Sequence, residues 1–288
     1  MSQASDAARG VVAVQHAFRS GFSKHGLRRV QEFRQRFFFG TGCDEQAVLS
    51  GLDFVIDEVV SRRNKGYPTR VVNLSLGSTP ANTGECSAEN PATRSAVDTL
   101  NALGVVVVAS AGNSGSSDRI SEPACIGPVV SVGSVNRNDI ASDFSNVAPE
   151  LDLFAFGESV LAAHNPFGID AALGTNTGLD EDPSENARTV TGTSIAAPQV
   201  AGAIASLASA SPGRSAAQLA RLVRTSRVRI DVRRPNAPVR TFPRLDLLSA
   251  YQQSQNALRV NLDTEKGDQF HKRKGSDFAG GGSGPRRP

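Results

Sequence analysis

Residues 192–198 read Gly-Thr-Ser-Ile-Ala-Ala-Pro and open a run of small and apolar side chains that continues to Ala210. Small residues of this kind suit a buried, closely packed helix, so we expect a helix over residues 194–210 with Ser194 in its first turn. A serine at a helix N-terminus gains exposure and the local dipole, and attacks a carbonyl when a base and oxyanion donors are near. The alternative is that Ser194 only caps the helix.

Asn113 lies in a second polar stretch, Ser110 to Gly115, which directly follows the apolar run Val105–Ala109. The apolar run predicts a fully buried strand, and α/β proteins bind ligands at the carboxyl ends of such strands. The side-chain amide of Asn113 can donate a hydrogen bond there. The alternative is an ordinary turn residue between two glycines.

Apolar runs and helical stripes alternate from Ala47 onward, which predicts a parallel sheet with helices between its strands. The predicted helices are 47–66, 93–103, 194–210 and 215–224, the last with Ser215 as N-cap. The predicted strands are 71–76, 105–109 and 128–135, and the region from there to Val190 is predicted to be rich in loops.

Three motifs occur in the order of the subtilisin-like family: Asn-Leu-Ser-Leu-Gly (73–77), Ala-Gly-Asn-Ser-Gly (111–115) and Gly-Thr-Ser-Ile-Ala-Ala-Pro (192–198). Weaker matches lie at 128–134, 143–146 and 151–157. The chain therefore resembles the subtilisin-like serine peptidases (subtilases, peptidase family S8) over residues 46–251.

The resemblance implies an α/β fold, a doubly wound and mostly parallel sheet with helices on both faces, and proteolysis by a serine endopeptidase. It implies Ser194 as nucleophile, Asn113 as side-chain oxyanion donor, and Ser75, Leu76 and Gly77 as the strand edge that binds an extended polypeptide substrate. Gln199 stands where the family commonly has histidine, a departure away from the catalytic triad that we expect to be harmless.

The family's catalytic aspartate and histidine motifs, Asp-Thr/Ser-Gly and His-Gly-Thr/Ser-x-Val-Ala-Gly, are not found in this chain. His25-Gly26 is the nearest dipeptide, and Asp6 is the only aspartate before it, yet neither has the family's surrounding residues. Gly10–Gln15 resembles the family strand that comes after the histidine-bearing helix, so we expect that the chain starts after both catalytic residues. The other histidines, His16, His164 and His271, align with no base.

We divide the chain into a basic N-terminal segment (1–45), the peptidase-like domain (46–251) and a disordered basic tail (252–288). The N-terminal segment has phenylalanines near helical spacing among arginines, which fits a surface helix or leader, or alternatively a segment that seeks an anionic membrane or partner. The tail holds seven Lys/Arg against four Asp/Glu, which accounts for the net charge of +3. A nearly neutral domain gives no indication of nucleic-acid binding.

Cys86 and Cys125 resemble a cysteine pair of some bacterial extracellular subtilases, which implies a disulfide and an oxidising compartment; two reduced cysteines are the alternative. Cys43 has no partner, and the sequence shows neither a signal peptide nor a transmembrane segment. The family needs no cofactor for its chemistry but often binds structural Ca²⁺. The acidic residues Asp180–Asp182 and Glu185 lack the ligand spacing of calcium loops, so we interpret them as a solvated loop.

Three hypotheses follow for the function, and the sequence indicates no oligomeric state. The first is a subtilisin-like endopeptidase whose sequence is incomplete at its N-terminus and whose activity is impaired as written. The second is a non-catalytic peptide-binding pseudopeptidase. The third is a hydrolase with a rebuilt base from the N-terminal segment or from another chain.

Overall fold

The computed structural model describes residues 11–16, 45–62, 69–78, 84–163 and 187–255, and its centre is a five-stranded sheet in the order β1-β2-β3-β4-β5. These strands are β1 (Val11–His16), β2 (Thr69–Ser75), β3 (Val106–Ser110), β4 (Val130–Val135) and β5 (Leu153–Phe156). Strands β2 to β5 pair in parallel, as the alternation of strand and helix predicts. The carboxyl ends of β2 and β3 therefore lie at one edge of the sheet.

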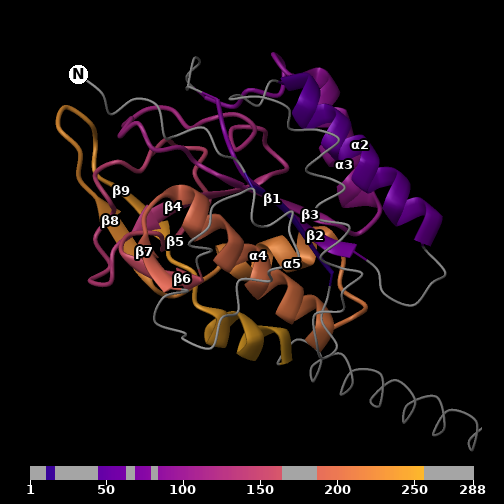
Figure 1. Ribbon diagram of the computed structural model, residues 1–288. Coiled ribbons are helices and arrows are strands. Elements are labelled where there is room, and N and C mark those ends of the chain that lie inside the picture. Colours follow the sequence, from indigo (N-terminus) through magenta and orange to yellow (C-terminus); the bar gives the residue numbers. More distant parts are fainter. Residues whose placement is uncertain (1–10, 17–44, 63–68, 79–83, 164–186, 256–288) are drawn as a thin grey trace, which may run out of the picture.

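Helices cover both faces of the sheet (Figure 1). Helices α2 (Glu45–Arg62) and α3 (Pro91–Ala102) pack side by side on one face, and α4 (Thr193–Ala210) and α5 (Ala216–Arg224) cover the other. Alternate residues of β3 serve two hydrophobic cores, because Val107 faces the α2–α3 side and Val106 and Val108 face the α4–α5 side. Burial on both faces explains the unbroken valine run and confirms the predicted doubly wound α/β class.

The predicted helices are present, with ends shifted by a few residues. The N-cap of α5 is the predicted Ser215: its hydroxyl accepts from the backbone of Gln218, whose side chain accepts in turn from the backbone of Ser215. This reciprocal capping box satisfies two backbone donors that the first helical turn leaves unpaired. Local sequence chemistry thus fixes the start of this helix.

The loop-rich prediction between β4 and Val190 was wrong in part. It missed β5 and the two strands of a small antiparallel sheet, β6 (Val160–Ala163) and β7 (Ala187–Val190). The hairpin of β8 (Arg229–Val232) and β9 (Arg240–Pro243) was not predicted either. All five strands have four residues, too few to establish a period, and exposed Arg229 and Asp231 alternate in β8 with buried apolar residues.

Strand β1 pairs with β2 in the antiparallel direction, with Val11 opposite Ser75 and His16 opposite Thr69. A strand, a helix and a second strand usually give parallel neighbours. Residues 17–44 lie between β1 and α2, and a connection of this length can return the chain in either direction. The sheet is therefore mostly, not wholly, parallel.

Several sequence predictions lie outside the described residues. They concern most of the N-terminal segment, the acidic loop, nearly all of the tail, and the side chains of Cys43, His25, His164 and His271. Within the part of the chain that the structure describes, no helix is both long and apolar enough to cross a bilayer.

An ion pair fastens α5 to the sheet. Arg224 donates to the carboxylate of Asp152 at 2.7 Å, and the same carboxylate accepts from the backbone N–H of Ser131 in β4 at 3.0 Å. Burial raises the pKa of Asp152 above its ordinary value, against the opposing effects of Arg224 and Ser131. The positive charge of Arg224 thus offsets part of the cost of burying the Asp152 carboxylate.

Replacing Arg224 with methionine should lower the free energy of unfolding by about 1.5–3 kcal/mol at pH 7, since a buried charge loses its partner. The folded pKa of Asp152 lies above its unfolded value and rises further without Arg224, which favours the charged form. The loss should therefore be small at acid pH, where Asp152 is protonated in both folded proteins, and grow as pH rises through the folded pKa. Urea unfolding at pH 4 and 7 measures this. Arg221→Met on the exposed side of the same helix is the matched control; an equal loss in both variants would contradict the assignment.

Candidate active site

Ser194 is the second residue of α4 and is half-buried. The chain reaches it through Gly192, whose φ of 149° is a backbone conformation that glycine adopts easily and other residues rarely do. The N–H of Gly192 donates to the carbonyl of Gly157, just beyond β5, at 2.7 Å, and the N–H of Ile195 donates back to Gly192 at 3.0 Å. The turn before Ser194 is thus anchored to the end of the central sheet.

Asn113 follows β3 and faces the start of α4. Its side-chain oxygen accepts from the backbone N–H of Thr193 at 2.9 Å and from the Thr193 hydroxyl at 2.8 Å. These two bonds occupy the oxygen and leave the amide Nδ2 to point elsewhere. A Cβ atom placed on Gly192 would lie 3.0 Å from Ser194 Oγ and 3.5 Å from Asn113 Nδ2, so a hydroxyl and an N–H donor border the same small space.

The end of β2 is hydrogen-bonded to the first turn of α4. The Ser75 hydroxyl donates to the carbonyl of Ser194 at 2.8 Å and accepts from the amide of Asn73 at 2.9 Å. Ser75 and Leu76 are buried, whereas Gly77 is exposed. The Ser75 side chain therefore supports Ser194, and its backbone lies opposite Val11 of β1.

Gln199, the predicted departure from the family pattern, has a structural use. Its amide donates to the carbonyls of Phe156 at the end of β5 and of Ile195 in its own helix. These bonds hold the first turns of α4 against the sheet.

No histidine of the described residues lies beside Ser194. The only one among them is His16, which pairs with Thr69 at the end of β2 opposite to Ser75. Six residues of strand separate these two ends, or about 20 Å. Among the same residues, no cluster of three histidine, cysteine or acidic side chains could hold a metal ion. The described residues thus bring the Ser194 hydroxyl and the Asn113 amide to one place, with no histidine beside them.

Two residues that shape the site were not singled out from the sequence. Thr193 orients the Asn113 amide, and Asn146 bonds to the loop that carries Asn113. Both lie inside motifs that resemble family motifs, Gly192–Pro198 and Asp143–Asn146. Their positions were visible in the sequence, but their bonds are long-range and depend on the fold.

Comparison with known proteins settles the family. A family model described as the subtilase family, Peptidase_S8, matches residues 35–267. The chain belongs to the subtilase family. Subtilisin DY of Bacillus licheniformis is 38% identical over 176 residues, which are 60% of this subtilase chain and 52% of the relative. Alkaline protease 1 of Aspergillus clavatus is 31% identical over 167 residues, 58% of this chain and 35% of the relative. The chain thus spans about half or less of these relatives.

Solved structures support the subtilase fold. A protease from Pseudoalteromonas arctica PAMC 21717 superposes with a TM-score of 0.57 at 24% identity, covering 76% of this chain and 61% of that one. The patellamide maturation protease PatA gives a TM-score of 0.56 at 23% identity, covering 75% and 70%. At these identities the likeness is one of fold.

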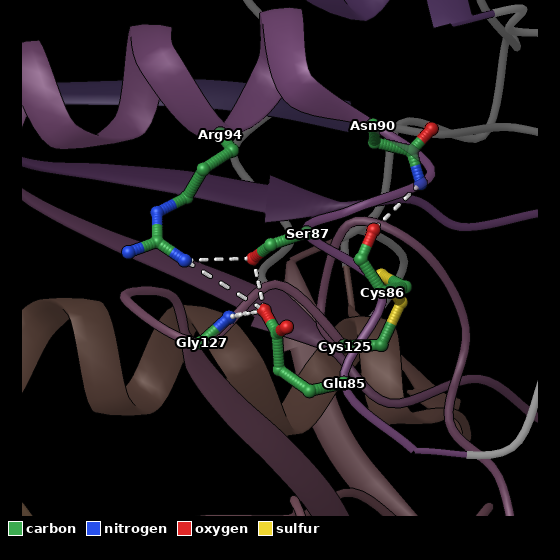
Figure 2. The surroundings of a disulfide bond; sticks show 7 residues. All are labelled: Glu85, Cys86, Ser87, Asn90, Arg94, Cys125 and Gly127. Atoms are coloured by element: carbon green, nitrogen blue, oxygen red, sulfur yellow. Dashed lines mark hydrogen bonds and ion pairs between the residues drawn. A yellow bond between two sulfur atoms is a disulfide. The ribbon is translucent and has the colours of Figure 1, made fainter.

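This subtilase chain contains the expected disulfide between Cys86 and Cys125, with a Cα–Cα distance of 5.4 Å (Figure 2). Both cysteines are buried, and the N–H of Cys86 also donates to the carbonyl of Cys125 at 3.1 Å. The bond joins the segment before α3 to the segment 121–127. That segment reaches the site, because Ser121 donates to the carbonyl of Ala111 and Glu122 accepts from the N–H of Ser78.

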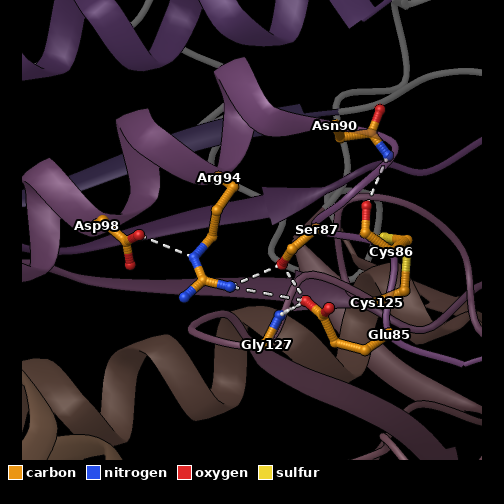
Figure 3. A network of polar contacts seen from close by, with 8 residues as sticks. All are labelled: Glu85, Cys86, Ser87, Asn90, Arg94, Asp98, Cys125 and Gly127. Carbon is orange, nitrogen blue, oxygen red and sulfur yellow. Dashed lines mark hydrogen bonds and ion pairs between the residues drawn. A yellow bond between two sulfur atoms is a disulfide. The ribbon is translucent and has the colours of Figure 1, made fainter.

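A polar network surrounds the disulfide (Figure 3). The Glu85 carboxylate accepts from the N–H of Gly127 at 2.7 Å and from the Ser87 hydroxyl, and Arg94 bridges Ser87 and Asp98. The hydrogen bond from Ser87 is the main reason that the pKa of Glu85 lies below its usual value. The hydrogen bond from Gly127 to the Glu85 carboxylate thus adds a further, charge-assisted connection between the two segments that the disulfide joins.

Proposed function

We propose that this chain binds extended polypeptides along Ser75–Gly77 and supplies the nucleophile and oxyanion donor of a subtilisin-like serine endopeptidase site. The catalytic histidine and aspartate of that site would come from outside the described residues. The observation that carries the proposal is the double hydrogen bond from Thr193 to Asn113, which leaves the Asn113 N–H groups beside the Ser194 hydroxyl. Family membership supports the reaction class.

Each group has a defined part in the proposed hydrolysis. A base takes the proton from Ser194 Oγ as this oxygen attacks the carbonyl carbon of the scissile peptide bond. The negative charge that develops on the carbonyl oxygen is stabilised by Asn113 Nδ2. The base then gives its proton to the leaving amine as the C–N bond breaks, and water hydrolyses the acyl-enzyme. Without histidine and aspartate, the only contributions to the reaction rate that remain are the positioning of the peptide and the stabilisation of the oxyanion.

The second candidate is a pseudopeptidase that binds peptides and does not cleave them. Among the described residues the only histidine, His16, lies at the far end of β2 from Ser75, which favours this candidate. Both functions use peptide binding along the same segment, Ser75–Gly77. They differ in whether Ser194 becomes reactive.

The proposed setting is an extracellular or otherwise oxidising compartment, since the buried Cys86–Cys125 bond persists under oxidising conditions. The chemistry proposed here uses protein groups alone and involves no cofactor. The proposed partner is a polypeptide in extended conformation, bound chiefly through its backbone, which implies broad sequence tolerance.

Two measurements on the purified chain test the proposal. Fluorescence anisotropy with labelled casein peptides should show binding that Gly77→Ala weakens, because a Cβ there would lie 2.8 Å from Ser121 Cβ and displace the strand edge. Gly213→Ala, whose Cβ meets nothing within 4 Å, is the matched control. A fluorophosphonate probe then reports reactivity: labelling that Ser194→Ala abolishes indicates a base from another part of the chain, and binding without labelling indicates the pseudopeptidase. Absence of both binding and labelling would reject the proposal.

A further inference from the structure

We propose that Asn146 is a positioning residue that fixes Asn113 for its role as oxyanion donor, an inference that rests on the function proposed above. Asn146 lies in the segment between β4 and β5, far from Asn113 in sequence and outside the nucleophile's helix. It is fully buried, with an exposed fraction of 0%. A buried amide needs hydrogen-bond partners, and the identity of those partners shows what it holds.

Every side-chain hydrogen bond that the structure gives Asn146 goes to the loop 111–116. Its Oδ1 accepts from the N–H of Ser114 at 3.1 Å, the hydroxyl of Ser114 at 2.9 Å and the N–H of Ser116 at 3.0 Å. Its Nδ2 donates to the carbonyl of Ala111 at 3.1 Å. One side chain thus bonds to the loop on both sides of Asn113.

The backbones of the two segments are also joined around this amide. The N–H of Asn146 donates to the carbonyl of Gly112 at 3.0 Å, and the N–H of Val147 donates to the carbonyl of Ser116 at 2.8 Å. Gly112 has a φ of 101°, and a Cβ there would overlap both the Ser121 hydroxyl and the Asn146 amide. The loop therefore has a glycine where the Ser121 and Asn146 side chains occupy the space.

Asn113 itself is exposed, so packing does not determine its orientation. Two sets of bonds do so: Thr193 bonds to its side chain, and Asn146 holds Gly112 and Ser114 on either side of its backbone. If the Asn146 bonds are lost, the loop gains freedom and the Thr193–Asn113 bonds weaken with it. The loss of the Asn146 side chain should therefore also weaken the hydrogen bonds that Thr193 donates to Asn113.

Amide hydrogen exchange in the full chain, followed by NMR, tests whether substitution of Asn146 affects Thr193. In Asn146→Ala the N–H groups of Ser114 and Ser116 should exchange about tenfold faster or more, and so should the N–H of Thr193, which donates to Asn113. Asn136→Ala is the matched control, because its Oδ1 accepts from the N–H groups of Asn138 and Ile140 in a neighbouring turn. It should leave Thr193 unchanged. Faster exchange at Ser114 and Ser116 with no change at Thr193 would overturn the proposal.

Asn146→Asp serves if the alanine variant does not fold, since it retains the acceptor oxygen and removes the donor to Ala111. Exchange at Thr193 should then change in the same direction as exchange at Ser114 and Ser116, and a change at these two with Thr193 unaltered would count against the assignment. The exchange measurement needs no peptide and no hydrolysis. Failure of the proposed function would therefore show as absent peptide binding with the exchange result intact, whereas failure of this inference shows in the exchange alone.

Discussion

Peptide hydrolysis should rise by about 10⁴- to 10⁶-fold when the chain is extended at its N-terminus by a segment that supplies a catalytic aspartate and histidine. The expected gain is large because an unassisted serine hydroxyl is a weak nucleophile at neutral pH. The segment can be taken from the DNA upstream of Met1 if Asp-Ser/Thr-Gly and His-Gly-Thr are encoded there, or otherwise from a related subtilase. Release of a fluorogenic group from a peptide substrate measures the rate.

Two variants of the extended chain separate the roles of its residues. Ser194→Ala should return hydrolysis to the level of the unextended chain. Asn113→Ala should reduce kcat by about 10²- to 10³-fold, a range measured for the loss of a side-chain oxyanion donor in subtilisin, with little change in KM. If the extended chain hydrolyses the peptide rapidly and Ser194→Ala does not slow it, another group is the nucleophile.

Removal of the disulfide by Cys86→Ala and Cys125→Ala together should lower the free energy of unfolding by about 4 kcal/mol. The two cysteines lie 39 positions apart in the sequence. The cross-link lowers the conformational entropy of the unfolded chain by an amount that grows with the length of the closed loop. Guanidinium unfolding under oxidising conditions measures the loss. Domains of this size commonly have a stability of about 5–15 kcal/mol, so the loss is a large part of the total.

The single variants provide the control for this prediction. Cys86→Ala and Cys125→Ala should each cost nearly as much as the double variant, since either one opens the loop. Strict additivity of the two single losses would instead indicate two independent packing defects. Reduction of the unaltered chain by dithiothreitol should reproduce the loss without any substitution.

The fold was predictable where sequence chemistry is local. The valines of β3, the Ser215–Gln218 cap and the small residues of α4 each specify their element through burial or backbone bonding close in sequence. The four-residue strands β5 to β9 were not predictable, because four residues are too few to show the alternation of apolar and polar side chains that is typical of a strand. Charged residues in β8 lower its apolar content further. The direction of β1 was not predictable either, because the long connection to α2 leaves it open.

The candidate site shows the same division. Ser194 and Asn113 were predictable because they lie in motifs at the ends of recognisable elements, and the structure brings both to the space beside Gly192. Ser75 was predicted to be part of the strand edge that binds substrate, and in the structure its side chain also donates to the carbonyl of Ser194. That use, like the bonds of Asn146, joins residues far apart in sequence and becomes visible only in three dimensions.

The Cys86–Cys125 bond also changes what a single backbone cut does to this molecule. Together with the intervening chain it forms a covalent ring that includes α3, β3 and Asn113. The stretch after Asn113 contains exposed residues such as Ser114 and Asp118, the kind of place where a neighbouring protease cuts first. A nick there opens the ring yet releases no fragment, so a nicked molecule would migrate as one species until it is reduced. The disulfide thus keeps a chain that is cut between Cys86 and Cys125 covalently joined, in addition to stabilising the fold.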